Sequence, residues 1–236
     1  MRAFLILPII ALSALSCGFG AGDDARIASV IIDPGVTPIA LRNMDDSGRA
    51  IGSIGRLKVL VESRGRRLHF AMNGGMYMED QRPLGLYVED GRTVRKLVTR
   101  TDGYGNFYLN PNGVFGVDST GKAFVVTTAE YPSLRGVRQA TQSGPMLVVD
   151  GRVNAAFDPR STNLNIRNGV GILPDGRALF AISRVTVSFH DFARFFQEHG
   201  CREALFLDGT ISRAYMPEAG LEQMDGVLGP LIVAED

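Results

Sequence analysis

The chain has 236 residues, of which 45% are hydrophobic and 21% are charged, which is enough apolar material for one globular domain or at most two. Lys plus Arg and Asp plus Glu each number 25, so the formal net charge is zero and neither nucleic acid nor a polybasic membrane contact is expected as the main partner. Two cysteines, Cys17 and Cys201, exclude a disulfide scaffold and a four-cysteine zinc site.

The N-terminal segment predicts export. Arg2 is followed by an apolar run over residues 3–15 that is too short to span a bilayer and that ends in small residues. We predict a signal peptide over residues 1–22 and a mature domain over residues 23–236, located in the periplasm or outside the cell. Cys17 offers an alternative, a lipid anchor on a new N-terminal cysteine. No other segment is long and apolar enough for a membrane span.

Most of the remaining chain has the pattern of short strands separated by turns. Four pairs of apolar, β-branched segments are predicted to form hairpins, which favours a largely antiparallel or mixed sheet. Their turn signals are Asp90-Gly91, Ser119-Thr120-Gly121, Asp150-Gly151 and Pro174-Asp175-Gly176. We therefore predict an α/β (α+β) fold, with a mixed, largely antiparallel sheet and a few packed helices in a single compact domain.

Two segments have the pattern of amphipathic helices. The first follows Ser53 as a cap and ends at Gly65, and the second follows Ser188 and ends at Gly200. A strand-like run over residues 204–207 comes directly after the second helix. This order places Asp208 at the C-terminal end of a strand, where site residues are common in folds that alternate helices and strands.

Two clusters in the first half of the chain combine glycine with polar residues. Asn73-Gly74-Gly75 ends an apolar run, and glycines there let the backbone turn sharply and expose N–H donors to a ligand. Further along, asparagines beside two aromatic residues can hydrogen-bond and stack on a sugar; they are Asn106, Asn110 and Asn112. An ordinary tight turn is the alternative for each cluster, including Asn112-Gly113 at the start of a hairpin.

Gln142-Ser143-Gly144 forms a third cluster. Its context differs from the Gly-x-Ser-x-Gly elbow of hydrolases, and a serine triad also needs a suitably placed histidine. The chain has three histidines, of which His190 and His199 belong to the second predicted helix. We expect Ser143 to donate a hydrogen bond rather than to act as a nucleophile.

Asp208 is the strongest candidate for a reacting group, because Gly209 and the hydroxyls of Thr210 and Ser212 follow it directly. A turn-capping aspartate is the alternative. Arg167 precedes a glycine-containing strand and is a candidate for anion binding, with a surface salt bridge as the alternative. The chain lacks the Gly-Lys-Ser/Thr phosphate loop and the zinc signatures, so no cofactor is predicted, and spacing alone fixes no metal site.

Taken in order, these motifs resemble the phosphodiester glycosidase family, in particular its exported bacterial branch. The motifs are Asn73-Gly74-Gly75, Asn112-Gly113-Val114-Phe115, Gln142-Ser143-Gly144-Pro145, Arg167 with Gly171-Ile172, and Leu207-Asp208-Gly209 with Ser212. The resemblance covers residues 28–233 and implies an α/β fold of its own and cleavage of a sugar-1-phosphodiester. The family usually has two glycines after the aspartate, and Thr210 takes the place of the second.

The leaving group of such a substrate is a phosphate monoester, which reduces the need for a general acid and increases the need for anion stabilisation. We therefore assign Asp208 as nucleophile or general base and Arg167 as phosphate clamp, because a guanidinium matches two phosphate oxygens. Asn73 completes the catalytic set. The predicted substrate-binding residues are Gly74, Gly75, Asn112, Gln142, Ser143, Gly144, Thr210 and Ser212.

Glu79 or Asp80 is a candidate for a second carboxyl group. The expected partner is a sugar-phosphodiester or another glycan of the cell envelope. A non-catalytic protein that binds an envelope polysaccharide in the same cleft is the alternative function.

Overall fold

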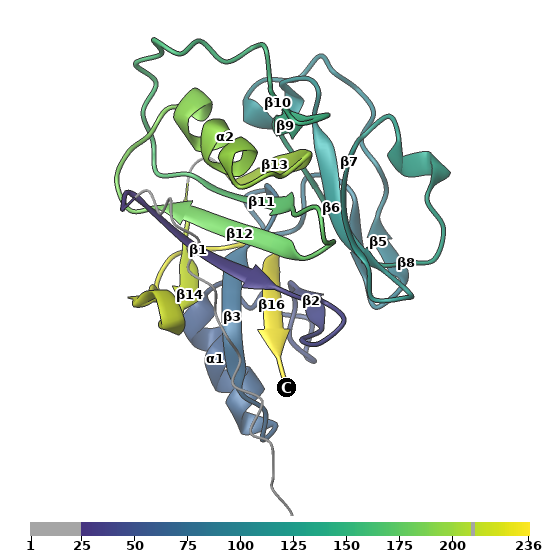
Figure 1. Cartoon of the computed structure of the whole chain (residues 1–236). Helices are drawn as coiled ribbons and strands as arrows, with labels where there is room; N and C mark the ends of the chain where they lie inside the picture. The colour runs from purple at the N-terminus through teal and green to yellow at the C-terminus, as the bar shows by residue number, and fades with distance from the viewer. Residues whose placement is uncertain (1–24, 209–210) are drawn as a thin grey trace, which may run out of the picture.

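The computed structural model describes residues 25–208 and 211–236 (Figure 1). The predicted signal peptide over residues 1–22, including Cys17, lies outside the described residues, as do Gly209 and Thr210.

Short strands form three sheets, and every strand pairing in the described ranges is antiparallel. The first sheet has the order β1 (Ile27–Ile32), β12 (Ala178–Ser183), β11 (Asn168–Ile172), β13 (Glu203–Asp208), β9 (Met146–Val149) and β10 (Arg152–Val153). The second has the order β15 (Leu221–Glu222), β14 (Ala214–Met216), β3 (Leu68–Asn73), β16 (Leu231–Glu235) and β2 (Ile39–Arg42). The third has the order β5 (Arg92–Arg95), β4 (Tyr87–Glu89), β8 (Val137–Ser143), β6 (Gly113–Asp118) and β7 (Ala123–Thr127).

The four predicted hairpins are confirmed as β4–β5, β6–β7, β9–β10 and β11–β12. In two of them both turn residues, an aspartate and a glycine, have positive φ angles: 50° and 83° at Asp90-Gly91, and 50° and 74° at Asp150-Gly151. Two consecutive positive φ angles match the right-handed twist of the paired strands, which explains why Asp-Gly was a reliable signal.

Both predicted helices are confirmed. The helix α1 (Ile54–Ser63) begins after Ser53, whose hydroxyl accepts a hydrogen bond from the Arg56 amide. The helix α2 (Phe189–Glu198) begins after Ser188, which accepts from the Asp191 amide. The described residues also form short 3₁₀ helices at Asn106–Tyr108, Tyr131–Ser133 and Pro217–Ala219. With two α-helices beside three antiparallel sheets in the described residues, the α/β label is too loose, and the fold is a sheet-rich single domain.

The two helices cover different sheets. The phenylalanine stripe of α2, which includes Phe192 and Phe196, packs with Phe206 against the first sheet, whereas Leu57 of α1 packs with Ala71 of the second sheet. Figure 1 shows α2 over β13 and β11, with α1 beside β3. The Phe stripe is therefore core packing, as its helical spacing predicts.

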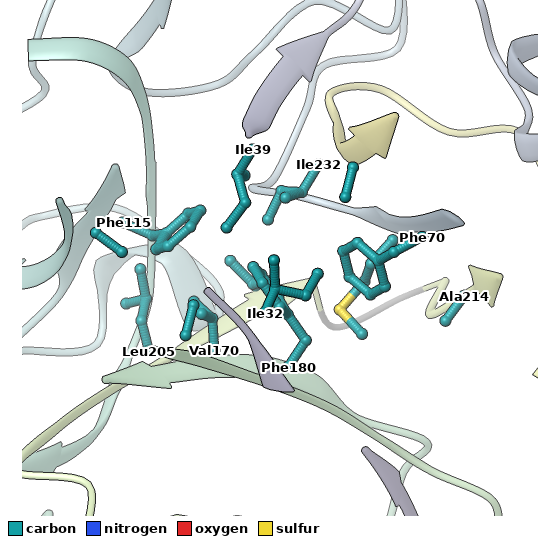
Figure 2. Close-up of a cluster of buried hydrophobic side chains, with 14 of the residues drawn as sticks. Ile32, Ile39, Phe70, Phe115, Val170, Phe180, Leu205, Ala214 and Ile232 are labelled. Atoms are coloured by element: carbon teal, nitrogen blue, oxygen red, sulfur yellow. The ribbon is translucent and has the colours of Figure 1, made fainter. Parts of the chain in front are cut away.

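The main core lies where the three sheets meet (Figure 2). Phe180 of the first sheet packs against Phe70 of the second, with ring centroids 4.6 Å apart, and against Phe115 of the third at 5.5 Å. All three rings are almost fully buried. This arrangement fixes the sheets relative to one another and brings the ends of β3, β8 and β13 together.

No α-helix in the described part of the chain is both long enough and apolar enough to cross a membrane.

We expect Phe180→Ala to lower the free energy of unfolding by about 3–5 kcal/mol, because it removes the ring that contacts both other sheets and leaves a cavity between them. Urea denaturation measures this change. Val185→Ala is the control, because Val185 is 48% exposed and its truncation should change the value by no more than about 0.5 kcal/mol. Equal effects of the two substitutions would contradict the central position of Phe180.

The thiol of Cys201 is buried under α2, and this burial raises its pKa to about 12. In a chain carrying Cys17→Ser, we expect 5,5′-dithiobis(2-nitrobenzoic acid) to react with Cys201 about 10³-fold more slowly in the native state than in urea, because the thiolate is the reactive form. Rapid labelling of the folded protein would show that the thiol is accessible and not a core residue.

Candidate active site

The end of β3 and the end of β13 are joined by a hydrogen bond between two predicted catalytic residues. The Asn73 amide Nδ2 donates to Asp208 Oδ2 at 2.9 Å and to the Ile211 carbonyl at 2.6 Å. Asn73 Oδ1 accepts from the Arg213 backbone N–H at 2.8 Å. The Asn73 side chain therefore holds the Asp208 carboxylate and also fixes the segment that follows residue 210.

Asn168, at the start of β11, completes this arrangement. It was not predicted as a site residue from the sequence. Its Nδ2 donates to the carbonyl and to Oδ1 of Asn73, at 2.8 and 3.1 Å. Its Oδ1 accepts from the Asp208 backbone N–H at 3.0 Å. The only signal in the sequence is a polar residue that opens an otherwise apolar, glycine-containing strand directly after Arg167.

Ser212 joins the same group of side chains, with its Oγ 3.4 Å from Asn168 Oδ1 and from the Asp208 carbonyl. The residues Asn73, Asn168, Asp208 and Ser212, which we call the Asp208 network, are each at most 4% exposed. Buried polar groups are stable only when they are hydrogen-bonded, so these contacts hold the carboxylate in one place.

Two further segments reach this position. Ser143, at the end of β8, donates its hydroxyl to the carbonyl of Leu207, the residue before Asp208. Tyr77 lies two residues after Gly75, and its hydroxyl donates to the Val227 carbonyl. Partial burial and the negative charge of Asp208 raise the pKa of Tyr77. Tyr77 is therefore a second residue near the carboxylate that the sequence did not single out.

The predicted glycines serve close packing. A Cβ on Gly74 would lie 2.5 Å from Ile232 Cγ1, one on Gly75 would lie 2.2 Å from Thr141 Oγ1, and one on Gly144 would lie 2.7 Å from Asn112 Cβ. The N–H of Gly74 donates to the Pro230 carbonyl at 2.8 Å, so it is not available to a ligand.

Asn112 and Gln142 are buried and hold loops. Asn112 Nδ2 donates to the Phe107 carbonyl at 2.9 Å. Gln142 Oε1 accepts from the backbone N–H groups of Leu86 and Val98, and Nε2 donates to the Val98 carbonyl. These contacts use the Asn112 donor and both polar atoms of the Gln142 amide within the protein, and the structure does not bring either residue into the Asp208 network.

Arg167 is 1% exposed and lies on the α2 side of the first sheet. Its guanidinium donates to the carbonyls of Val187 and Asn163, each at 2.9 Å, and lies 3.6 Å from the centre of the Phe189 ring. Burial lowers the pKa of Arg167 to about 10, which leaves it charged at neutral pH. The predicted alternative role of Arg167, a surface salt bridge, is wrong because the side chain is buried. Its contacts are with protein carbonyls and an aromatic ring, so they do not present the guanidinium to a phosphate.

The predicted second carboxyl lies on an exposed turn, where Asp80 accepts from the Arg82 backbone N–H. Neither Glu79 nor Asp80 joins the Asp208 network. Within residues 25–208 and 211–236, no cluster of three or more His, Cys, Asp or Glu side chains is arranged to hold a metal ion.

Comparison with known proteins relates most of the chain to one family. The phosphodiester glycosidase (NAGPA) family model matches residues 66–226. The Escherichia coli K12 protein YigE, which is uncharacterised, is 34% identical over 215 residues, covering 91% of this chain and 83% of YigE.

Two solved structures share the fold. The catalytic domain of zebrafish N-acetylglucosamine-1-phosphodiester alpha-N-acetylglucosaminidase, auto-inhibited by its pro-peptide, aligns with a TM-score of 0.60 at 15% identity, over 90% of this chain and 84% of the other. A Burkholderia pseudomallei protein, described only provisionally as exported, aligns with a TM-score of 0.59 at 13% identity, over 88% and 73% of the two chains. The family match, the extent of identity to YigE and the shared fold agree with the order of the sequence motifs, and the chain belongs to the phosphodiester glycosidase family.

Proposed function

We propose that this protein hydrolyses the bond between a sugar and phosphate in sugar-1-phosphodiesters or related glycans of the cell envelope. The main support is the Asp208 network, in which three family motifs distant in sequence meet through hydrogen bonds: Asn73 donates to Asp208, and Asn168 contacts both. The zebrafish relative, whose name specifies an N-acetylglucosamine-1-phosphodiester, supports this class of substrate.

In this proposal Asp208 is the reacting carboxylate. It either attacks the anomeric carbon itself or accepts a proton from the water that attacks it. In both routes the bond from the anomeric carbon to the phosphate oxygen breaks, and the electron pair leaves with the phosphate monoester. The hydrogen bond from Asn73 keeps the carboxylate oriented throughout.

We assign binding of the phosphate to Arg213 in place of Arg167. The Arg213 backbone N–H donates to Asn73 Oδ1, and the guanidinium forms two hydrogen bonds with Asp225, at 2.9 and 3.0 Å. The Asp225 side chain is 71% exposed, and exposed ion pairs contribute little, so the phosphodiester monoanion of the substrate can replace this carboxylate at small cost. Arg167 is then a positioning residue on the other side of the strand.

We also propose that the protein is exported to the periplasm or beyond, as a free or lipid-anchored protein. The apolar run over residues 3–15 after Arg2 and the provisional description of the Burkholderia relative support this location. The alternative function, glycan binding without catalysis, is favoured by one observation: Asp208 is only 4% exposed.

We expect Asp208→Asn to lower kcat by about 10²–10⁴-fold, because it removes the reacting charge while the amide retains the side chain's size. The assay measures free sugar and phosphate monoester released from a panel of sugar-1-phosphodiesters that includes the N-acetylglucosamine compound. Asp46→Asn is the control, because Asp46 lies at the surface and pairs with Arg64. Full turnover by a folded Asp208→Asn variant would refute the assignment, and no turnover by the unmodified protein would favour glycan binding.

We expect Arg213→Gln to raise KM for these substrates about tenfold or more, because a charge-assisted hydrogen bond to phosphate is lost. Arg64→Gln removes the same charge from an exposed ion pair elsewhere and should leave KM unchanged. An unchanged KM in the Arg213→Gln variant would exclude this arginine from phosphate binding.

A further inference from the structure

A cavity of about 240 Å³ lies beside the N-terminus of α2, on the face of the first sheet that α2 covers. Its walls come from the 3₁₀ helix at Asn106–Tyr108, the loop over residues 154–163, Pro145 and the first turn of α2. The Pro145 carbonyl accepts from the Phe206 backbone N–H, so the cavity lies near the end of β13 that carries Asp208. None of its lining residues belongs to the Asp208 network.

Aromatic and polar residues both line this cavity. Phe157 and Phe189 both line it, and their rings are stacked with centroids 5.0 Å apart and planes 10° apart. The side chains of Asn106 and Asn110 also line it, and neither amide has a hydrogen-bond partner in the described part of the chain. The outer face of the Phe157 ring and amides without protein partners suit a pyranose ring, which has C–H groups on its faces and hydroxyls at its edge.

The charge of the lining favours a neutral ligand. Its ionisable side chains are Asp158 and His190, and it contains no Lys or Arg. Asp158 has a cation nearby, since Arg160 Nε is 3.5 Å from its carboxylate. The lining itself therefore offers no cation to a phosphate group, since Arg160 is an exposed side chain outside it. The cavity volume also lies below the range of about 300–1,000 Å³ that is typical of drug-sized ligands. A single neutral sugar ring fits both constraints.

The walls are held in place before any ligand binds. Arg167 donates to the Asn163 carbonyl in the loop and lies against the Phe189 ring, so one buried side chain positions two parts of the lining. Asn154 fixes the start of the loop through its hydrogen bond to the Met146 carbonyl at 2.9 Å. A preformed site loses less conformational entropy on binding.

We propose that this cavity is a second carbohydrate site, which binds one neutral pyranose unit of a glycan, with Arg167 as its positioning residue. Asn106 and Asn110 hydrogen-bond the hydroxyls, and the outer face of the Phe157 ring, which Phe189 supports from behind, contacts the ring face. Binding here does not require hydrolysis at Asp208, so the site can exist whether or not the protein is an enzyme.

Two adjacent alanines provide a matched test. Ala156 lines the cavity and Ala155 does not, and both are exposed, so tryptophan at either position leaves the core intact. We would titrate D-glucose, N-acetylglucosamine and inorganic phosphate into the full chain, and follow binding by ¹H–¹⁵N chemical-shift changes at residues 154–163 and 189–190.

At least one of the two sugars should bind at these residues, whereas phosphate should not. Ala156→Trp should weaken this binding about tenfold or more, while Ala155→Trp and Asp208→Asn should retain it. Absence of sugar binding at these residues, binding unaffected by Ala156→Trp, or loss of binding in Asp208→Asn would each overturn the proposal. Because no turnover is measured, failure of the hydrolytic function gives a different result from failure of this site.

Discussion

The contact of three phenylalanine rings, one from each sheet, is the constraint on which the rest of the structure depends. Phe180 lies against both Phe70 and Phe115, and together they fix the relative positions of three sheets that share no backbone hydrogen-bond ladder. Tight packing in a core permits few alternative arrangements. As a result, strand ends that are far apart in sequence meet at one place, and the Asp208 network forms there.

The network shows how the fold holds a buried carboxylate. Asn73 and Asn168 belong to different sheets and hydrogen-bond each other as well as the Asp208 residue. Each amide presents donors and acceptors in fixed directions, so a small shift of one sheet would leave several buried groups unpaired. Sheet packing and site geometry are therefore coupled.

The two faces of the first sheet present different polar side chains to different neighbours. Asp208 is directed toward Asn73 of the second sheet, whereas Arg167, one residue before Asn168, is directed toward Phe189 of α2. Successive residues near a strand point to opposite faces, so neighbouring motif residues are placed in different environments. Alternation at the start of β11 thus places Asn168 in the Asp208 network and Arg167 against Phe189, a lining residue of the proposed sugar cavity.

Local chemistry made much of the fold predictable. Asp-Gly turns, serine caps and the Phe stripe of α2 depend on residues that are close in sequence. The position of Asp208 at the end of a strand was predicted in the same way, and the order of the motifs indicated the family. The contacts of individual polar side chains could not be predicted in this way. Arg167 turned inward, Gln142 and Asn112 were used by loops, and Asn168 entered the network, because each outcome depends on which distant residues the three packed sheets bring within hydrogen-bonding distance. Those distances are set by the packing of the three sheets and cannot be inferred from neighbours in sequence.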